Sequence, residues 1–140
     1  MWRNPKGYSG EGLIIPFRFQ NGAFTDQQEA DITNWINELS GYLNSCIRFV
    51  NDTRDKKYSK DYIFVRAYDE NGKWLKGDCS SNVGNITKYY KREYQMLTLS
   101  IPQGGGHCIW KKTVQHEFMH ALGFFHEHQR PDRDQSRGFD

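Results

Sequence analysis

The chain has 140 residues, of which 36% are hydrophobic and 26% charged, and its formal net charge is only +2. This length is enough for one domain with a substantial core. The interspersed charges form no basic face of the kind that binds nucleic acid. No run of about 18 apolar residues predicts a membrane span, and Met1 does not open a secretory signal peptide.

The first fifty residues predict a strand, a helix and a second strand. Leu13–Phe19 is expected to be a strand, and Pro16, which has no N–H group, places it near a sheet edge or a bulge. Thr25 and Gln28 have the spacing of a capping box that begins a helix. Residues 47–50 then follow as the second strand. The apolar positions of the helix recur every three or four residues and predict one buried face: Ile32, Trp35, Ile36, Leu39, Tyr42 and Leu43.

The remaining pattern alternates in the same way. Residues 62–67 predict a third strand, followed by a turn at Asn71-Gly72. Residues 94–101 predict a fourth strand, and after a glycine loop residues 110–124 predict a second long helix. Alternating strands and helices indicate the α/β (α+β) class, with a twisted, mixed sheet and two long helices.

The second helix carries an arrangement of side chains suited to a metal. His116 and His120 are four residues apart, so on a helix both imidazoles lie on one face, one turn apart. Glu117 follows the first histidine and can reach the open side of a metal held there. This is the H-E-x-x-H arrangement of zinc hydrolases.

A third histidine, His126, follows six residues after His120. In a continuous helix its ring would point about 120° away from the first two and lie about 9 Å along the axis. To share their metal, the helix must stop and the chain must turn back. Gly123 stands where a left-handed C-terminal turn does this without a steric cost.

The whole pattern, H-E-x-x-H-x-x-G-x-x-H, resembles the zinc signature of the metzincin metalloproteases. Residues 126–134, His-Glu-His-Gln-Arg-Pro-Asp-Arg-Asp, resemble the extension of that signature in the astacin family, and the resemblance extends over roughly residues 12–134. An isolated H-E-x-x-H also arises by chance on an amphipathic helix. His107 and His128, taken singly, are typical of solvated or structural histidines. The eleven-residue pattern with its extension favours the astacin interpretation.

The resemblance implies a zinc metalloendopeptidase with a zincin-like upper lobe, whose second helix carries the motif. One Zn²⁺ per chain would be held by His116, His120 and His126, and Glu117 would act as general base for a metal-activated water that hydrolyses peptide bonds. The substrates would be proteins or peptides. Glu127 is implied to pair with a mature N-terminal ammonium, and its alternative is a helix-capping or surface glutamate.

Substrate binding is also implied by the resemblance. The strand containing Met96, Leu97, Thr98 and Leu99 is expected to be the edge strand that pairs with an extended peptide. The alternative is an ordinary edge strand without a binding role.

Three cysteines are present, an odd number. Cys79 and Cys108 match a disulfide of the resembled family. Cys46 matches a cysteine whose partner lies near the family's far C-terminus, and its alternative is a buried free thiol. The disulfide favours an extracellular, secreted protein. Two N-glycosylation sequons, Asn51-Asp52-Thr53 and Asn85-Ile86-Thr87, suit the same location, and the alternative is a chance occurrence, which is frequent for such triplets.

The resemblance further implies a lower lobe that contains a Met-turn and a tyrosine zinc ligand. All three methionines, Met1, Met96 and Met119, precede the third histidine. Residues 1–140 are therefore expected to be a C-terminally incomplete catalytic domain, whose signal peptide and propeptide are not in the chain and whose missing lobe would pair with Cys46. The functional alternatives are part of a working endopeptidase, a fragment that binds zinc without turnover, or a non-catalytic binding module.

Overall fold

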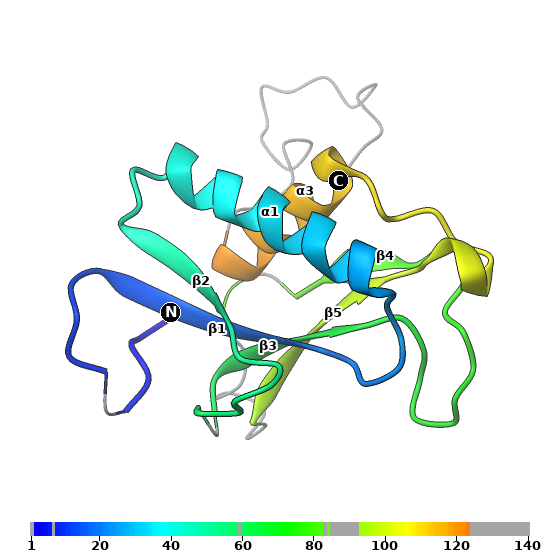
Figure 1. Ribbon diagram of the computed structural model, residues 1–140, viewed down its shortest axis with the longest axis horizontal. Coiled ribbons are helices and arrows are strands. Elements are labelled where there is room, and N and C mark those ends of the chain that lie inside the picture. Colours follow the sequence, from blue (N-terminus) through cyan, green and yellow to red (C-terminus); the bar gives the residue numbers. More distant parts are fainter. Residues whose placement is uncertain (1, 7, 59, 83, 85–92, 124–140) are drawn as a thin grey trace, which may run out of the picture.

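The computed structural model describes residues 2–6, 8–58, 60–82, 84 and 93–123. These residues form a five-stranded sheet with both long helices on one of its faces (Figure 1). The elements in chain order are β1 (Leu13–Phe19), α1 (Asp26–Tyr42), β2 (Ile47–Asn51), β3 (Tyr62–Arg66), β4 (Cys79–Ser81), β5 (Tyr94–Leu99), the short 3-10 helix η1 (Pro102–Gly104) and α3 (Lys111–Leu122). The predicted α/β class with a mixed sheet and two long helices is confirmed.

The sheet order is β2-β1-β3-β5-β4, and only β4 runs antiparallel to its neighbour. The expectation that Met96–Leu99 lies at an edge is therefore wrong, because β5 lies between β3 and β4. Ser81 pairs with Leu97 and Cys79 with Leu99, so β4 occupies the side of β5 that the sequence left open. A strand of three residues carries too little alternation to be predicted from sequence.

The expectation that Pro16 marks an edge strand or a bulge is also wrong, since β1 pairs with β2 on one side and β3 on the other. Its missing N–H nevertheless points to a locally unpaired side. The N–H of Leu13 bonds the Cys46 carbonyl toward β2, whereas that of Ile14 bonds the Asn4 side chain on the opposite side. Backbone N–H groups alternate in direction along a strand, so the nitrogen of Pro16 points to the same side as that of Ile14, toward β3. Pairing with β3 starts only at Phe17, so no β3 carbonyl needs a donor at Pro16.

Helix α1 begins as the capping box predicts. The Gln28 N–H donates to Thr25 Oγ1 at 3.1 Å, and the Thr25 N–H donates to Gln28 Oε1 at 2.9 Å. The predicted stripe is buried at Ile32, Ile36 and Leu39, while Trp35 and Leu43 are partly buried. Tyr42 is the exception, being 66% exposed in the last turn, where its hydroxyl donates to Glu38 Oε1 at 2.7 Å. Among the described residues, no helix is long and apolar enough to cross a membrane.

The core lies between the sheet and the two helices. Phe118 of α3 is its central side chain, fully buried, with ring centroids 5.2 Å from Phe49 of β2 and 6.1 Å from Phe17 of β1, both edge to face. Val114 and Ala121 flank it on the same face of α3 and are also fully buried. These contacts join the second helix to the middle and one edge of the sheet.

We expect Phe118→Ala to lower the free energy of unfolding by about 3–5 kcal/mol, because it removes a fully buried ring and leaves a cavity. Trp110→Ala, one turn before the buried stripe at an exposed position, is the control and should change stability by less than about 0.5 kcal/mol. Urea unfolding of both variants measures the difference. Equal losses would contradict the placement of α3 on the sheet.

Candidate metal centre

The helix that carries the histidines ends directly before Gly123, the residue at which the sequence predicts a turn, and so before the end of the predicted range 110–124. It begins at Lys111, and its last helical residue is Leu122. Gly123 has φ 112°, a left-handed conformation that strains any residue with a Cβ atom. Its N–H donates to the carbonyl oxygens of Met119 and His120, closing the final turn. The predicted turn at Gly123 is confirmed.

The apolar and histidine-bearing sides of α3 point in different directions. Val114, Phe118 and Ala121 face the sheet, and the helical angle places His116 and His120 about 150° around the axis from them. Packing of the apolar side therefore sets the direction of the imidazoles. His120 is nevertheless only 3% exposed, so the side of the helix away from the sheet is also enclosed at this point.

The two imidazoles converge. His116 Nε2 and His120 Nε2 lie 2.9 Å apart, and the rings are nearly perpendicular, at 84°. Two imidazole nitrogens bound to one tetrahedral zinc at about 2.0–2.1 Å would be about 3.3 Å apart. A change of a few tenths of an ångström separates the two arrangements, so the donor pair fits a zinc ion.

Glu117 is buried as well, with 5% of its surface exposed. Around the helix it lies between the apolar side and the histidine side. A carboxylate this buried is uncommon on an ordinary helix. Glu117 is therefore enclosed on the same helix as the two convergent imidazoles.

Two of the three predicted metal ligands are thus brought together. His126 and Glu127 lie outside the described residues, as does His128, and their roles remain predictions. Within the ranges that the structure describes, no group of three or more His, Cys, Asp or Glu side chains gathers to hold a metal, and His116 and His120 are a convergent pair. His107 is exposed on the loop before α3, which agrees with its interpretation as a solvated histidine.

The end of α3 is held by two distant segments that sequence reasoning missed. The Trp2 indole N–H donates to the Ala121 carbonyl at 2.6 Å, and both residues are buried. The Gly84 N–H donates to the His120 carbonyl at 2.8 Å. Carbonyls in the last turn of a helix lack partners within the helix. Trp2 supplies a partner to the Ala121 carbonyl, and Gly84 adds a second donor to the His120 carbonyl. They lie 119 and 36 positions earlier in the chain, where no local pattern reveals them.

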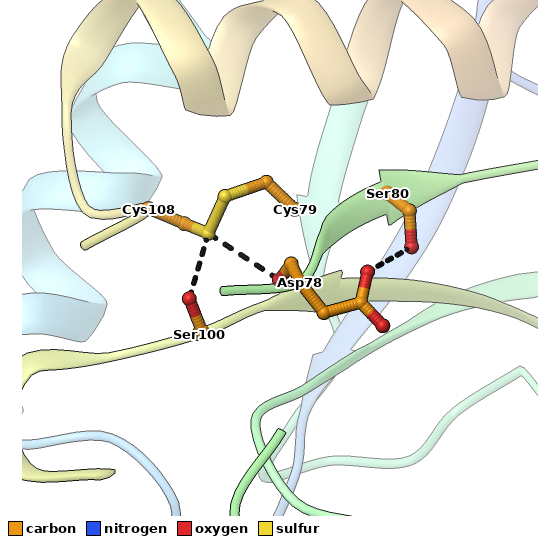
Figure 2. The surroundings of a disulfide bond; sticks show 5 residues. All are labelled: Asp78, Cys79, Ser80, Ser100 and Cys108. Carbon is orange, nitrogen blue, oxygen red and sulfur yellow. Dashed lines mark hydrogen bonds between the residues drawn. A yellow bond between two sulfur atoms is a disulfide. The ribbon is translucent and has the colours of Figure 1, made fainter. Parts of the chain in front are cut away.

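The start of α3 is held by a disulfide. Cys79 in β4 is bonded to Cys108, three residues before the helix begins, as the family resemblance implied (Figure 2). The Ser100 hydroxyl lies 3.0 Å from the Cys108 sulfur and is the donor of this hydrogen bond, because a disulfide sulfur carries no hydrogen. The chain passes so closely that a Cβ atom at Gly106 would overlap the Ser100 side chain. The disulfide therefore ties the antiparallel edge strand β4 to the start of the histidine-bearing helix α3.

Comparison with known proteins identifies the family. The model of the peptidase family Astacin matches residues 8–137, which include the histidine motif. The chain belongs to the astacin family. An astacin-like metalloendopeptidase from Gallus gallus is 39% identical over 90 residues, covering 64% of this chain and 17% of that protein. Zinc metalloproteinase nas-14 from Caenorhabditis elegans is 36% identical over 120 residues, covering 86% of this chain and 20% of that protein.

The fold is also that of a solved member of the family. High choriolytic enzyme 1, a hatching enzyme zinc-protease from Oryzias latipes, superposes with a TM-score of 0.64 and 27% identity, covering 94% of this chain and 52% of that one. The chain thus spans from about a sixth to about half of the length of these astacin relatives.

The environment of Cys46 contradicts one of its two interpretations. Cys46 is a free cysteine and exposed, so the alternative of a buried free thiol is wrong. It lies directly before β2, and its carbonyl accepts the Leu13 N–H at 2.9 Å. The backbone at this position is fixed while the thiol faces outward, which leaves it accessible to another cysteine.

We expect Trp2→Phe to loosen the last turn of α3, because the Ala121 carbonyl loses its partner at a cost of about 1–3 kcal/mol. Hydrogen exchange of the amides in residues 119–123 should become faster. Trp35→Phe makes the same chemical change in a half-buried residue whose indole has no hydrogen bond within the described chain, and it is the control. Unchanged exchange in the Trp2 variant would contradict a role at the helix end.

Replacing both Cys79 and Cys108 by alanine should lower the free energy of unfolding by about 3–4 kcal/mol, since a closed loop of this length no longer restricts the unfolded chain. Cys46→Ala, at an exposed thiol, should have little effect. Urea unfolding under non-reducing conditions compares the variants. A double variant as stable as the Cys46 variant would show that the bond does not stabilise the fold.

Proposed function

We propose that this chain is the metal-binding part of a zinc metalloendopeptidase of the astacin family. The observation that carries the proposal is the convergence of His116 Nε2 and His120 Nε2 to 2.9 Å on a helix that ends in a left-handed turn at Gly123. His126 is proposed as the third ligand, because that turn redirects the chain three residues before it.

The chemistry assigned to the site is hydrolysis of a peptide bond by water. A bound zinc ion supplies a Lewis acid that polarises the peptide carbonyl and makes a water reactive near neutral pH. His116 and His120 would bind as neutral imidazoles. Glu117 would take the proton of the attacking water and pass it to the leaving amine nitrogen. Its burial supports this role, because a carboxylate shielded from bulk water keeps its proton for the leaving group.

The peptide substrate is proposed to pair with β4 instead of β5. Both sides of β5 are occupied by strands, whereas β4 is the outermost described strand on the side of the sheet where α3 packs. An extended peptide can add to such an edge through backbone hydrogen bonds. The disulfide at Cys79 would hold this edge at a fixed position relative to the histidine helix.

The remaining parts of the catalytic domain are proposed to lie in a lower lobe that follows residue 140. The exposed Cys46 is the proposed partner of a cysteine in that lobe, and Glu127 is proposed to order the site through an ion pair. The Cys79–Cys108 disulfide supports an extracellular location, where such bonds persist. Without the lower lobe, residues 1–140 are proposed to bind zinc and to cleave peptides weakly or not at all.

Metal content tests the ligands. The purified chain should hold one zinc ion per molecule by inductively coupled plasma mass spectrometry. His120→Ala should lose it, because one converging imidazole is removed. His107→Ala changes an exposed histidine outside the site and should retain full occupancy. Full zinc occupancy in His120→Ala would contradict the proposed ligand set.

Cleavage tests the base. In a chain extended by its C-terminal lobe, Glu117→Gln should keep the zinc and lower kcat by about 10²–10⁴-fold, because the amide has nearly the same shape but takes up no proton. The assay is chelator-sensitive hydrolysis of an unfolded protein. Full activity in Glu117→Gln would assign proton transfer to another group, and absence of cleavage in the extended wild type would favour a binding module.

A further inference from the structure

One of the two sequons lies at a free edge of the sheet. In Asn51-Asp52-Thr53, Asn51 is the last residue of β2 and is exposed. β2 is the outermost described strand on its side and pairs only with β1. An N-linked oligosaccharide is bulky and needs such a surface position. The other sequon, Asn85-Ile86-Thr87, lies outside the described residues.

The carboxamide of Asn51 is held by its oxygen. The Thr53 N–H donates to Asn51 Oδ1 at 3.1 Å, and the Thr53 hydroxyl donates to the same atom at 2.6 Å. Nδ2 makes no hydrogen bond to any other described residue, so the nitrogen that would carry a sugar is the unengaged end of the side chain. Substitution at Nδ2 leaves both bonds to Oδ1 intact.

Asn51 also borders a polar cavity. It has a volume of about 600 Å³ and lies between the first half of α1 and the segment after β2. Asn51 is part of its lining, together with the hydroxyl-bearing Thr33, the amide of Asn34 and the guanidinium of Arg54. These groups can exchange hydrogen bonds with sugar hydroxyls and with an N-acetyl carbonyl.

We propose that Asn51 carries an N-linked oligosaccharide whose first sugar lies in this cavity and whose remainder covers the free edge of β2. In the transfer, Asn51 Nδ2 attacks C1 of a lipid-linked oligosaccharide diphosphate. The C1–N bond forms, the C1–O bond breaks, the lipid diphosphate leaves, and Nδ2 gives up one of its two protons. This proposal depends on the extracellular location proposed above and is independent of catalysis.

The folded sequon is closed to a transferase. Asp52 is buried, pairs with Arg18 at 3.1 Å, and accepts the Lys57 and Tyr58 N–H groups at 2.8 and 3.1 Å. The Thr53 hydroxyl, besides donating to Asn51, accepts the Phe19 N–H at 3.0 Å. A transferase that must bind the Asn51 side chain and the Thr53 hydroxyl together would have to break these hydrogen bonds, which costs free energy. Attachment therefore precedes the pairing of β1 with β2.

Such a sugar would also protect the exposed edge of β2 from pairing with other chains. An edge strand presents unpaired N–H and C=O groups on which another chain can form a strand. The edge at β4 must stay open if a peptide substrate pairs there, but the edge at β2 has no such role. A large polar group at the end of β2 would hinder edge-to-edge association on this side alone.

Site occupancy tests the proposal. The chain is produced in human cells behind a cleavable secretory leader, treated with peptide N-glycosidase in H₂¹⁸O, and analysed by peptide mass spectrometry of the medium and the microsomal fraction. The expected result is an ¹⁸O-labelled aspartate at position 51. Thr53→Ser, which keeps a hydroxyl, should retain the label, and Asn51→Gln should lose it. Disulfide-bonded chain from either fraction with unlabelled Asn51 would overturn the proposal while leaving the metal site untouched.

Two further readouts test the timing and the placement. Microsomes supplied with the urea-unfolded chain should modify Asn51 at least about tenfold more than microsomes supplied with the folded chain, and equal modification would overturn the timing. Amides in residues 30–34 of α1 should exchange more slowly in the glycosylated protein than in Asn51→Gln, because the first sugar covers them. Identical hydrogen exchange in the two proteins would contradict the placement of the first sugar in the cavity. Zinc content should be the same in both proteins.

Discussion

Burial of Val114, Phe118 and Ala121 of α3 against the sheet is the interaction on which the candidate metal centre depends. A helix held by one face cannot rotate, so the opposite direction is set for His116 and His120. The ends of the helix are held separately. The disulfide at Cys108 fixes its start, and hydrogen bonds from Trp2 and Gly84 fix its last turn. The two imidazoles therefore meet at 2.9 Å because core packing and end contacts leave them little freedom.

The two edges of the sheet differ in ways that match different uses. β4 is short, antiparallel and tied by a disulfide to the entry of α3, which suits a rigid edge beside a reaction centre. β2 lies at the other edge and ends in a sequon whose polar groups are fixed by β1 and by the following loop. Pairing with a peptide is proposed at the first edge and covering by a sugar at the second, so that only one edge is open to other chains.

Local signals predicted most elements because they act within a few residues. The Thr25–Gln28 capping box, the 3–4 spacing of α1 and the terminal glycine of α3 each placed an element close to its observed position. The errors concern neighbours in space. Pro16 reads as an edge residue because the sequence does not show that β3 pairs with β1 only from Phe17 onward. Met96–Leu99 was assigned to an edge because the three residues of β4 are too few to be recognised. Tyr42 continued the apolar stripe in sequence but lies at the exposed end of the helix.

The sequence by itself determined the family and the side chains that are available to bind a metal. Residue type and spacing along one helix and one turn are local properties. It placed His116, Glu117 and His120 within one turn and required a reversal at Gly123. Only the tertiary structure decided which strand forms the open edge and which distant groups complete the last turn of that helix. The reason is physical. Strand pairing and the bond from Trp2 to Ala121 join residues far apart in the chain, and their partners are selected by packing of the whole core.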